Sequence, residues 1–192
     1  MIQLNRHRMC HRIFPLLGGL FYFFAFGISN PLSAQTLSLS VGASAGYAPL
    51  LTYGRSDRSG GEIALFADLE YGKAIGRFQF TYLLPGTVAN DNLKSGYAFH
   101  GSLGYNAPVT AQLSVPLMLT GGVSIVRFTA FGSAGTFTDA SPQIGLTVSP
   151  YYKINDQIAL QLAVRYIHGF VADTRSDPIH LADALIGIRY TL

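Results

Sequence analysis

The sequence predicts an all-β fold: an eight-stranded antiparallel transmembrane β-barrel, an up-and-down meander, preceded by a cleaved signal peptide. Apolar residues alternate with small or polar ones, and this alternation recurs in eight segments. A period of two is typical of a β-strand, and about ten residues suffice for a tilted strand to cross a bilayer. Only 12% of the residues are charged while 49% are hydrophobic. A soluble domain usually carries about twice that charged fraction.

The N-terminus has the three parts of a secretory signal peptide. Basic residues in 1–12 precede an apolar run at 13–28, and Leu32-Ser33-Ala34 gives a small-residue exit. The alternative is a membrane anchor, but the run is short and no positive stop-transfer cluster follows it. We therefore expect residues 1–34 to be removed and 35–192 to form one domain. The single cysteine, Cys10, would leave with the leader, which excludes disulfides and thiolate chemistry from the mature chain.

The first strand, 37–47, shows the alternation most clearly. Its odd-numbered residues are Leu, Leu, Val, Ala, Ala and Tyr, and its even-numbered residues are all Ser or Gly. A helix would scatter both sets around its axis, so this segment is a strand with one apolar face. The other expected strands are 62–71, 77–83, 97–106, 113–126, 143–154, 158–167 and 182–192.

The connections between these strands alternate in length. Short turns are expected at 72–75, 107–112 and 155–157, and long, polar loops at 48–61, 84–96, 127–141 and 168–181. Short periplasmic turns and long extracellular loops are typical of outer-membrane barrels. With an even strand count, both ends of the barrel domain would lie on the periplasmic side. The long loops are the candidate sites for a surface ligand.

Charges and tyrosines indicate which strand face meets lipid. The eight strand charges all share the polar face: Glu62, Asp68, Glu70, Arg77, Lys153, Arg165, Asp183 and Arg189. A soluble barrel with its apolar face inward would also carry all its strand charges on one face. Aromatic residues, however, form two rows on the apolar face, one low (Tyr71, Phe78, Tyr105, Tyr152, Tyr190) and one high (Tyr47, Tyr82, Tyr97, Tyr166). Two such girdles are typical of membrane interfaces.

The C-terminal segment 184–192 alternates apolar residues and has Tyr190 third from the end. With Ile188 and Leu192 it resembles the C-terminal assembly signal of the small OmpA/OmpX-type outer-membrane barrels; the usual final Phe is here Leu192. The resemblance covers the architecture of 35–192. It implies export by the general secretory route to the outer membrane of a Gram-negative-type bacterium. It also implies contact with outer-membrane lipid and lipopolysaccharide, and with the barrel-assembly machinery during biogenesis.

The inward-facing polar residues form the candidate functional site. They are Asp68, Glu70, Arg77, Gln79, His100, Arg165, Asp183 and Arg189. We expect Glu70 to face Arg77, Asp68 to face Gln79, and Asp183 to lie diagonal to Arg165. Eight strands leave an interior just wide enough for side chains to fill. Four acids against four bases, Lys153 included, therefore indicate a neutral structural plug; the alternative is a gated ion path.

Two prolines lie inside expected strands. Pro116 and Pro150 each remove a ladder hydrogen bond, and a closed barrel has no edge strand to accept them. We therefore expect β-bulges at both positions.

The sequence contains only weak matches to catalytic or metal-binding motifs. His100-Gly-Ser102 invites comparison with outer-membrane lipid A deacylases, but parity turns both side chains into the lumen, away from lipid. His168 and His180 flank a loop without the spacing of a metal motif. We expect no cofactor and no metal. Beyond residue 12 the charges balance at ten of each sign, which leaves no basic patch for nucleic acid.

These observations favour a non-enzymatic outer-membrane barrel with surface-exposed loops, acting in envelope integrity or surface interaction. The first alternative is a narrow pore for small solutes or ions. The second is an envelope lipid-modifying enzyme of the lipid A deacylase type.

Overall fold

The computed structural model describes residues 37–53, 56–88, 91–130, 135–170 and 178–192. The predicted signal peptide lies outside them. The described residues form the strands β1 Leu37–Tyr53, β2 Ser56–Tyr71, β3 Ala74–Leu83, β4 Gly86–Val88, β5 Asp91–Pro108, β6 Leu113–Ala130, β7 Thr136–Val148, β8 Tyr151–Lys153, β9 Ile158–Gly169 and β10 Ile179–Thr191. Within this part of the chain, no helix has the length and hydropathy of a membrane span.

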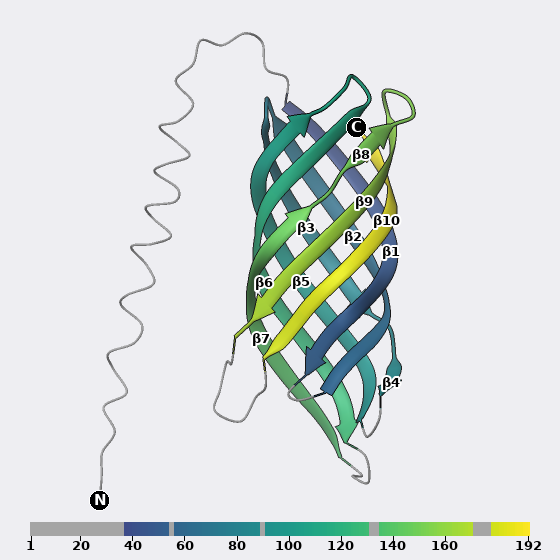
Figure 1. The fold of residues 1–192 in the computed structure, drawn as a ribbon, viewed down its shortest axis with the longest axis vertical. Coiled ribbons are helices and arrows are strands. Elements are labelled where there is room, and N and C mark those ends of the chain that lie inside the picture. Colours follow the sequence, from purple (N-terminus) through teal and green to yellow (C-terminus); the bar gives the residue numbers. More distant parts are fainter. Residues whose placement is uncertain (1–36, 54–55, 89–90, 131–134, 171–177) are drawn as a thin grey trace, which may run out of the picture. The chain divides into compact units, whose positions relative to one another are not determined.

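The strands close into an eight-stranded antiparallel barrel (Figure 1). Strands that follow one another along the chain pair side by side, and β1 pairs with β10 to close the ring. β7 and β8 are two parts of one barrel strand, since both lie between β6 and β9. β4 only extends the hairpin next to β5. The predicted fold class is confirmed.

The β2–β3 turn is tighter than the sequence suggested. Tyr71 pairs with Ala74, so the turn contains only Gly72 and Lys73. Gly72 has a φ of 60°, and both common two-residue hairpin turns, types I′ and II′, require a positive φ at this first central position. This turn sets the register of the hairpin, and it places Asp68 opposite Arg77.

The predicted bulges at the prolines are absent. Near Pro150 the ladder stops after Val148 and resumes at Tyr151. The pairs Leu117–Val148 and Ser114–Tyr151 keep one register across the gap, so no residue is inserted. Pro116 pairs in register with Asn106 on its other side. The backbone accommodates both prolines at one level by interrupting one strand, with the Ser149 N–H donating to the Pro116 carbonyl at 3.0 Å.

The long loops are shorter than predicted because the strands continue past the aromatic rows. β1 and β2 leave only residues 54–55 between them, and β6 and β7 extend deep into the expected loop at 127–141. β1 contains a register shift between Tyr47 and Leu50 at this level. Pairing can continue outside a bilayer because backbone hydrogen bonds there need no apolar face.

Side chains alternate between outside and inside throughout the barrel wall. Leu65, Leu146 and Ile186 point outward with exposed fractions of 56%, 64% and 70%. Asp68 and Arg165 point inward and are 0% and 2% exposed. An apolar wall around a polar interior is the reverse of a soluble barrel, so the outer face must meet hydrocarbon.

Candidate functional site

The lower interior, near the short turns, contains a network of two guanidiniums and two carboxylates. Arg77 binds both oxygens of Asp68, at 2.6 and 2.7 Å. Its remaining donors bind Ser149 at 3.0 Å and Gln161 at 2.9 Å, so one side chain connects opposite parts of the wall. A bidentate pair with satisfied remaining donors is the geometry in which a buried ion pair is best compensated.

Arg189 joins the second carboxylate to this network. It forms an ion pair with Glu70, lies 3.1 Å from the Asp68 carboxylate and donates to Ser40 at 3.0 Å. Its guanidinium lies 4.4 Å from the centre of the Tyr151 ring, within cation–π range. Asn106 donates to the Tyr151 hydroxyl at 2.9 Å. The lower interior is therefore closed by side chains from β1, β2, β3, β5, β8, β9 and β10.

The upper ionic cluster consists of Arg165, Asp183 and Glu62. Arg165 binds both oxygens of Asp183, at 2.7 and 2.6 Å, and one of its nitrogens lies 3.3 Å from the Glu62 carboxylate. It also donates to the Thr81 hydroxyl at 3.3 Å. Two buried carboxylates thus share a single guanidinium.

Apolar residues lie between and above these clusters. Ala64, Ala163 and Leu185, on β2, β9 and β10, pack together on one side of the barrel between the two ionic clusters. Above the upper cluster, inward side chains form a buried apolar core at the long-loop end, the apolar cap: Leu83, Leu93, Ala98, Val126, Ile167, Ile179 and Leu181. β5, β6 and β7 contribute polar inward side chains instead, since Gln143 contacts His100 and Ser124, and Thr120 contacts Ser102 and Thr147.

The register corrects three predicted pairings. Asp68, not Glu70, faces Arg77, because the β2–β3 turn is two residues long. Gln79 lies opposite Phe66 instead of Asp68, and it donates to Thr81 at 3.2 Å. Asp183 is directly opposite Arg165 and not diagonal to it.

The charge balance also differs from the expectation. Lys153 has the inward parity, but it is exposed at the lower rim. The described interior ion pairs therefore join four carboxylates to three guanidiniums, an excess of one carboxylate. That excess lies in the upper cluster, where Glu62 and Asp183 share Arg165.

His100 and Ser102 are both buried in the interior and each bonds elsewhere. His100 Nε2 lies 2.8 Å from the Gln143 side-chain oxygen, and Ser102 is 2.8 Å from the Thr120 hydroxyl. No hydrogen bond between His100 and Ser102 is present among the described contacts. This is not the arrangement of a nucleophile activated by a base.

His168 and His180 meet on the outer face above the upper aromatic row. Their ring centres are 4.4 Å apart, and His168 packs edge-on against Phe170 at 5.1 Å. The Gly169 N–H donates to His180 Nδ1 at 3.1 Å. Burial, and then the neighbouring His168, lower the pKa of His180. In the part of the chain that the structure describes, no cluster of His, Cys, Asp and Glu could hold a metal ion.

The predicted girdle residues lie on the outer face. They come from β1, β2, β3, β5, β8, β9 and β10, and Phe78 is the most exposed of them at 79%. Phe78 lies above the lower row in which the sequence placed it, because on β3 it is Ala74 that pairs with Tyr71 and Tyr105. The full set is Tyr47, Tyr71, Phe78, Tyr82, Tyr97, Tyr105, Tyr152, Tyr166 and Tyr190. At the C-terminus, Ile188 and Tyr190 also face outward, and the Leu192 N–H donates to the Leu39 carbonyl at 2.9 Å.

Several interior residues were not among those predicted from the sequence. Ser149, Gln161 and Tyr151 complete the lower network, and the apolar cap closes the upper end. The alternation within their strands predicts that these side chains point inward. They were omitted because only ionisable side chains and their expected neighbours were selected as the candidate site. Their contacts cross the lumen, and no sequence pattern records which strands lie opposite one another.

Neither a protein-family model nor a curated protein matches this sequence. Solved structures do. Neisserial surface protein A is 12% identical, with a TM-score of 0.66 over 82% of this chain and 100% of its own. A major outer membrane protein from Thermus thermophilus is 13% identical, with a TM-score of 0.58 over 82% and 100%. Ail, the attachment invasion locus protein of Yersinia pestis, is 12% identical, with a TM-score of 0.56 over 81% and 97%.

The chain has the fold of a small outer-membrane β-barrel. At this level of identity the likeness concerns the fold alone. The apolar outer wall of this chain supplies the second argument, because such a wall is stable only in a bilayer. Fold and wall together assign the protein to the bacterial outer membrane. In barrels of this kind the short turns face the periplasm and the long hairpins face the cell exterior.

Proposed function

We propose that this protein is a non-conducting barrel that acts structurally in the envelope and through its extracellular hairpins. The observation that carries the proposal is the filled interior. Two ionic clusters bridge the lumen, and the apolar cap covers the extracellular end. A dry apolar constriction opposes water and ions, and the ion pairs below it satisfy one another.

Conductance of the purified protein in planar bilayers tests this proposal. We expect background current from the wild type and from Arg165→Glu, provided that both fold. A steady single-channel current in the wild type, altered in selectivity by Arg165→Glu, would show instead that the interior is a filter and would favour the narrow-pore alternative.

The interior gives no support to a deacylase-type activity. A lipid-facing nucleophile and base would be required, whereas His100 and Ser102 are buried in the lumen and bonded to Gln143 and Thr120. Mass spectrometry of lipid A from cells with and without the protein should therefore show the same acylation pattern. Loss of an acyl chain that depends on Ser102 would contradict the proposal.

A surface-ligand role is supported by the extracellular hairpins. Lys94 and Arg127 are exposed beyond the upper aromatic row on the neighbouring strands β5 and β6. Ail, which shares the fold, has been crystallised with the heparin analogue sucrose octasulfate, with a TM-score of 0.55 to this chain. We propose an anionic ligand for this rim. Calorimetry with sucrose octasulfate should detect binding that Lys94→Ser with Arg127→Ser weakens and that high salt suppresses; no measurable heat would refute it.

We also propose contacts with the membrane and with the barrel-assembly machinery. The outward wall would contact outer-membrane lipid and lipopolysaccharide, and the outward residues Ile188 and Tyr190 with Leu192 would be recognised by the barrel-assembly machinery. Slower membrane insertion of Tyr190→Ser, with normal secretion, would support the second point. Unchanged insertion would contradict it.

A further inference from the structure

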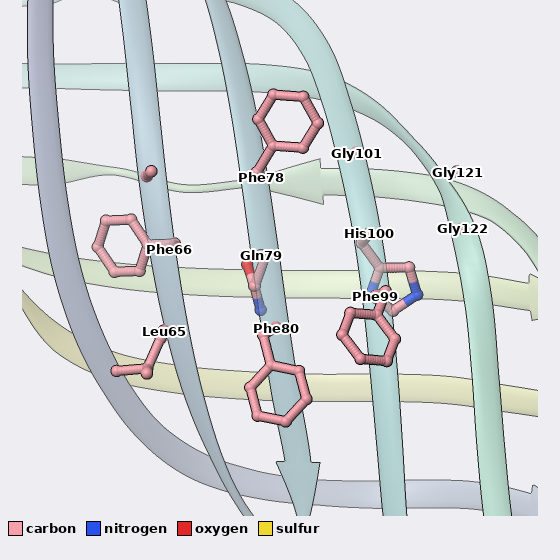
Figure 2. Close-up of a pocket in the computed structure, with 11 residues that line it drawn as sticks. Leu65, Phe66, Phe78, Gln79, Phe80, Phe99, His100, Gly101, Gly121 and Gly122 are labelled. Atoms are coloured by element: carbon pink, nitrogen blue, oxygen red, sulfur yellow. The ribbon is translucent and has the colours of Figure 1, made fainter.

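The outer wall has a hollow at mid-height, on the strands β2, β3, β5 and β6. Its volume is about 530 Å³. Figure 2 shows the ring of Phe78 on one side of it and the rings of Phe80 and Phe99 on the other. We call this hollow the acyl slot. Phe80 and Phe99 form one continuous side, since their ring centres are 5.1 Å apart.

Two glycines leave the floor of the slot bare. Phe78 pairs with Gly101, and Gly101 pairs with Gly121, in an unbroken register. Glycine weakens a strand interior, and it commonly marks a bulge, a close backbone approach or a ligand. The continuous register excludes a bulge between them. A Cβ added to Gly101 would meet nothing within 4 Å, and one added to Gly121 would meet only the Gln143 carbonyl at 3.7 Å.

Close packing within the protein therefore does not explain these two glycines. Gly122, which faces inward next to them, is different: an added Cβ there would lie 2.0 Å from the Phe99 carbonyl. The barrel needs glycine at position 122, but it has room for a side chain at positions 101 and 121. The vacant space on the outer wall points to an external occupant.

We propose that the acyl slot holds one acyl chain of an outer-membrane lipid. The slot lies about midway between the upper and lower aromatic rows. On β3, Ala74 marks the level of the lower row, because it pairs with Tyr71 and Tyr105. Phe78 is four residues from Ala74 and four from Tyr82 of the upper row. An empty hollow there would forfeit dispersion contacts on every side. Its span from β2 to β6 is three strand spacings, roughly 14 Å. One leaflet of a hydrocarbon core of about 30 Å is about 15 Å deep, so the end of an acyl chain reaches the middle of the wall.

A second copy of the barrel fits the slot less well. A twofold contact places the same patch of both molecules face to face. Two hollows would then oppose each other and enclose a larger void. A single flexible chain can enter the slot without that cost.

Lipid retention tests the proposal. The protein is reconstituted in vesicles of palmitoyl-oleoyl phosphatidylethanolamine, extracted in mild detergent and weighed by native mass spectrometry. We expect the wild type to retain one lipid, and Gly101→Leu with Gly121→Leu to lower its occupancy about tenfold. The matched control, Ala45→Leu with Ala184→Leu, places the same two leucine side chains on the outward face of β1 and β10 and should retain lipid like the wild type.

Folding is checked by circular dichroism and by gel mobility without boiling. If the leucine variant fails to fold, Gly101→Ala with Gly121→Ala replaces it, because both Cβ atoms have room; it should retain less lipid than the wild type. Equal retention by wild type and filled variants, or no retained lipid in the wild type, would overturn the proposal. A dimer that disappears on filling would assign the slot to a second copy and would also overturn it.

Discussion

Asp183 and Arg165 face each other directly on β10 and β9, joined by two parallel hydrogen bonds of 2.7 and 2.6 Å. Both side chains are buried, and Glu62 lies 3.3 Å from the same guanidinium. In the lower cluster the relation is reversed, because Asp68 contacts two guanidiniums, those of Arg77 and Arg189. The two ionic clusters should therefore respond differently to the loss of one arginine.

Arg165→Met should destabilise the barrel more than Arg77→Met. Removing one partner of a buried ion pair typically costs about 3–5 kcal/mol. Arg165→Met leaves two carboxylates without their cation, whereas Asp68 keeps Arg189 when Arg77 is removed. Urea unfolding of the refolded variants measures both changes. Adding Glu62→Gln and Asp183→Asn to Arg165→Met should recover part of the loss. An inverted order of the two single variants would contradict the sharing of Arg165 by two carboxylates.

A charge placed in the outer wall should be costly in proportion to its depth. Leu162 points outward on β9, four residues below Tyr166. Leu162→Lys should lower the unfolding free energy by about 2–4 kcal/mol, since a lysine near the bilayer midplane loses its hydration. Leu37→Lys at the periplasmic rim is the control and should cost about 0–1 kcal/mol. Equal costs at the two depths would argue against membrane insertion at this height.

The His168–His180 pair should loosen the extracellular end of the β9–β10 hairpin as the pH falls. The pKa of His180 is lowered in the folded protein, so protons bind the open state more readily. Stability from this site is thus complete above the ordinary histidine pKa of about 6.5 and decreases below it, until the folded pKa is passed. Hydrogen exchange of the Gly169 amide, corrected for its intrinsic rate, should accelerate between neutral and mildly acidic pH.

A variant without the titrating group provides the control for that measurement. His180→Phe removes both the proton site and the acceptor of the Gly169 N–H. It should show faster exchange at neutral pH and little further change on acidification. The same acid-dependent acceleration in His180→Phe would assign the effect to another group.

The mature protein should begin near Gln35. The leader at 1–34 combines a basic segment, an apolar run and a small-residue exit, which signal peptidases recognise. Intact-mass measurement of protein extracted from outer membranes should show the loss of Met1–Ala34. A mature mass that still includes Cys10 would refute this prediction, and labelling with a thiol reagent offers an independent check.

The sequence by itself determined the fold class and the inner and outer faces of the wall. Alternation is a local property of the sequence, and a charge on the lipid-facing side is costly. The outward direction of Leu65 and the inward direction of Asp68 can therefore be predicted without knowing which strands are neighbours. Only the tertiary structure determined which residues face each other across strands. The positive φ of Gly72 allows a two-residue turn, and with that turn Arg77 faces Asp68 instead of the predicted Glu70. The apolar cap joins β3, β5 and β6 to β9 and β10, and only closure of the barrel brings these strands together. The acyl slot depends on the registers of β2, β3, β5 and β6, which place Phe78 beside Gly101 and Gly121.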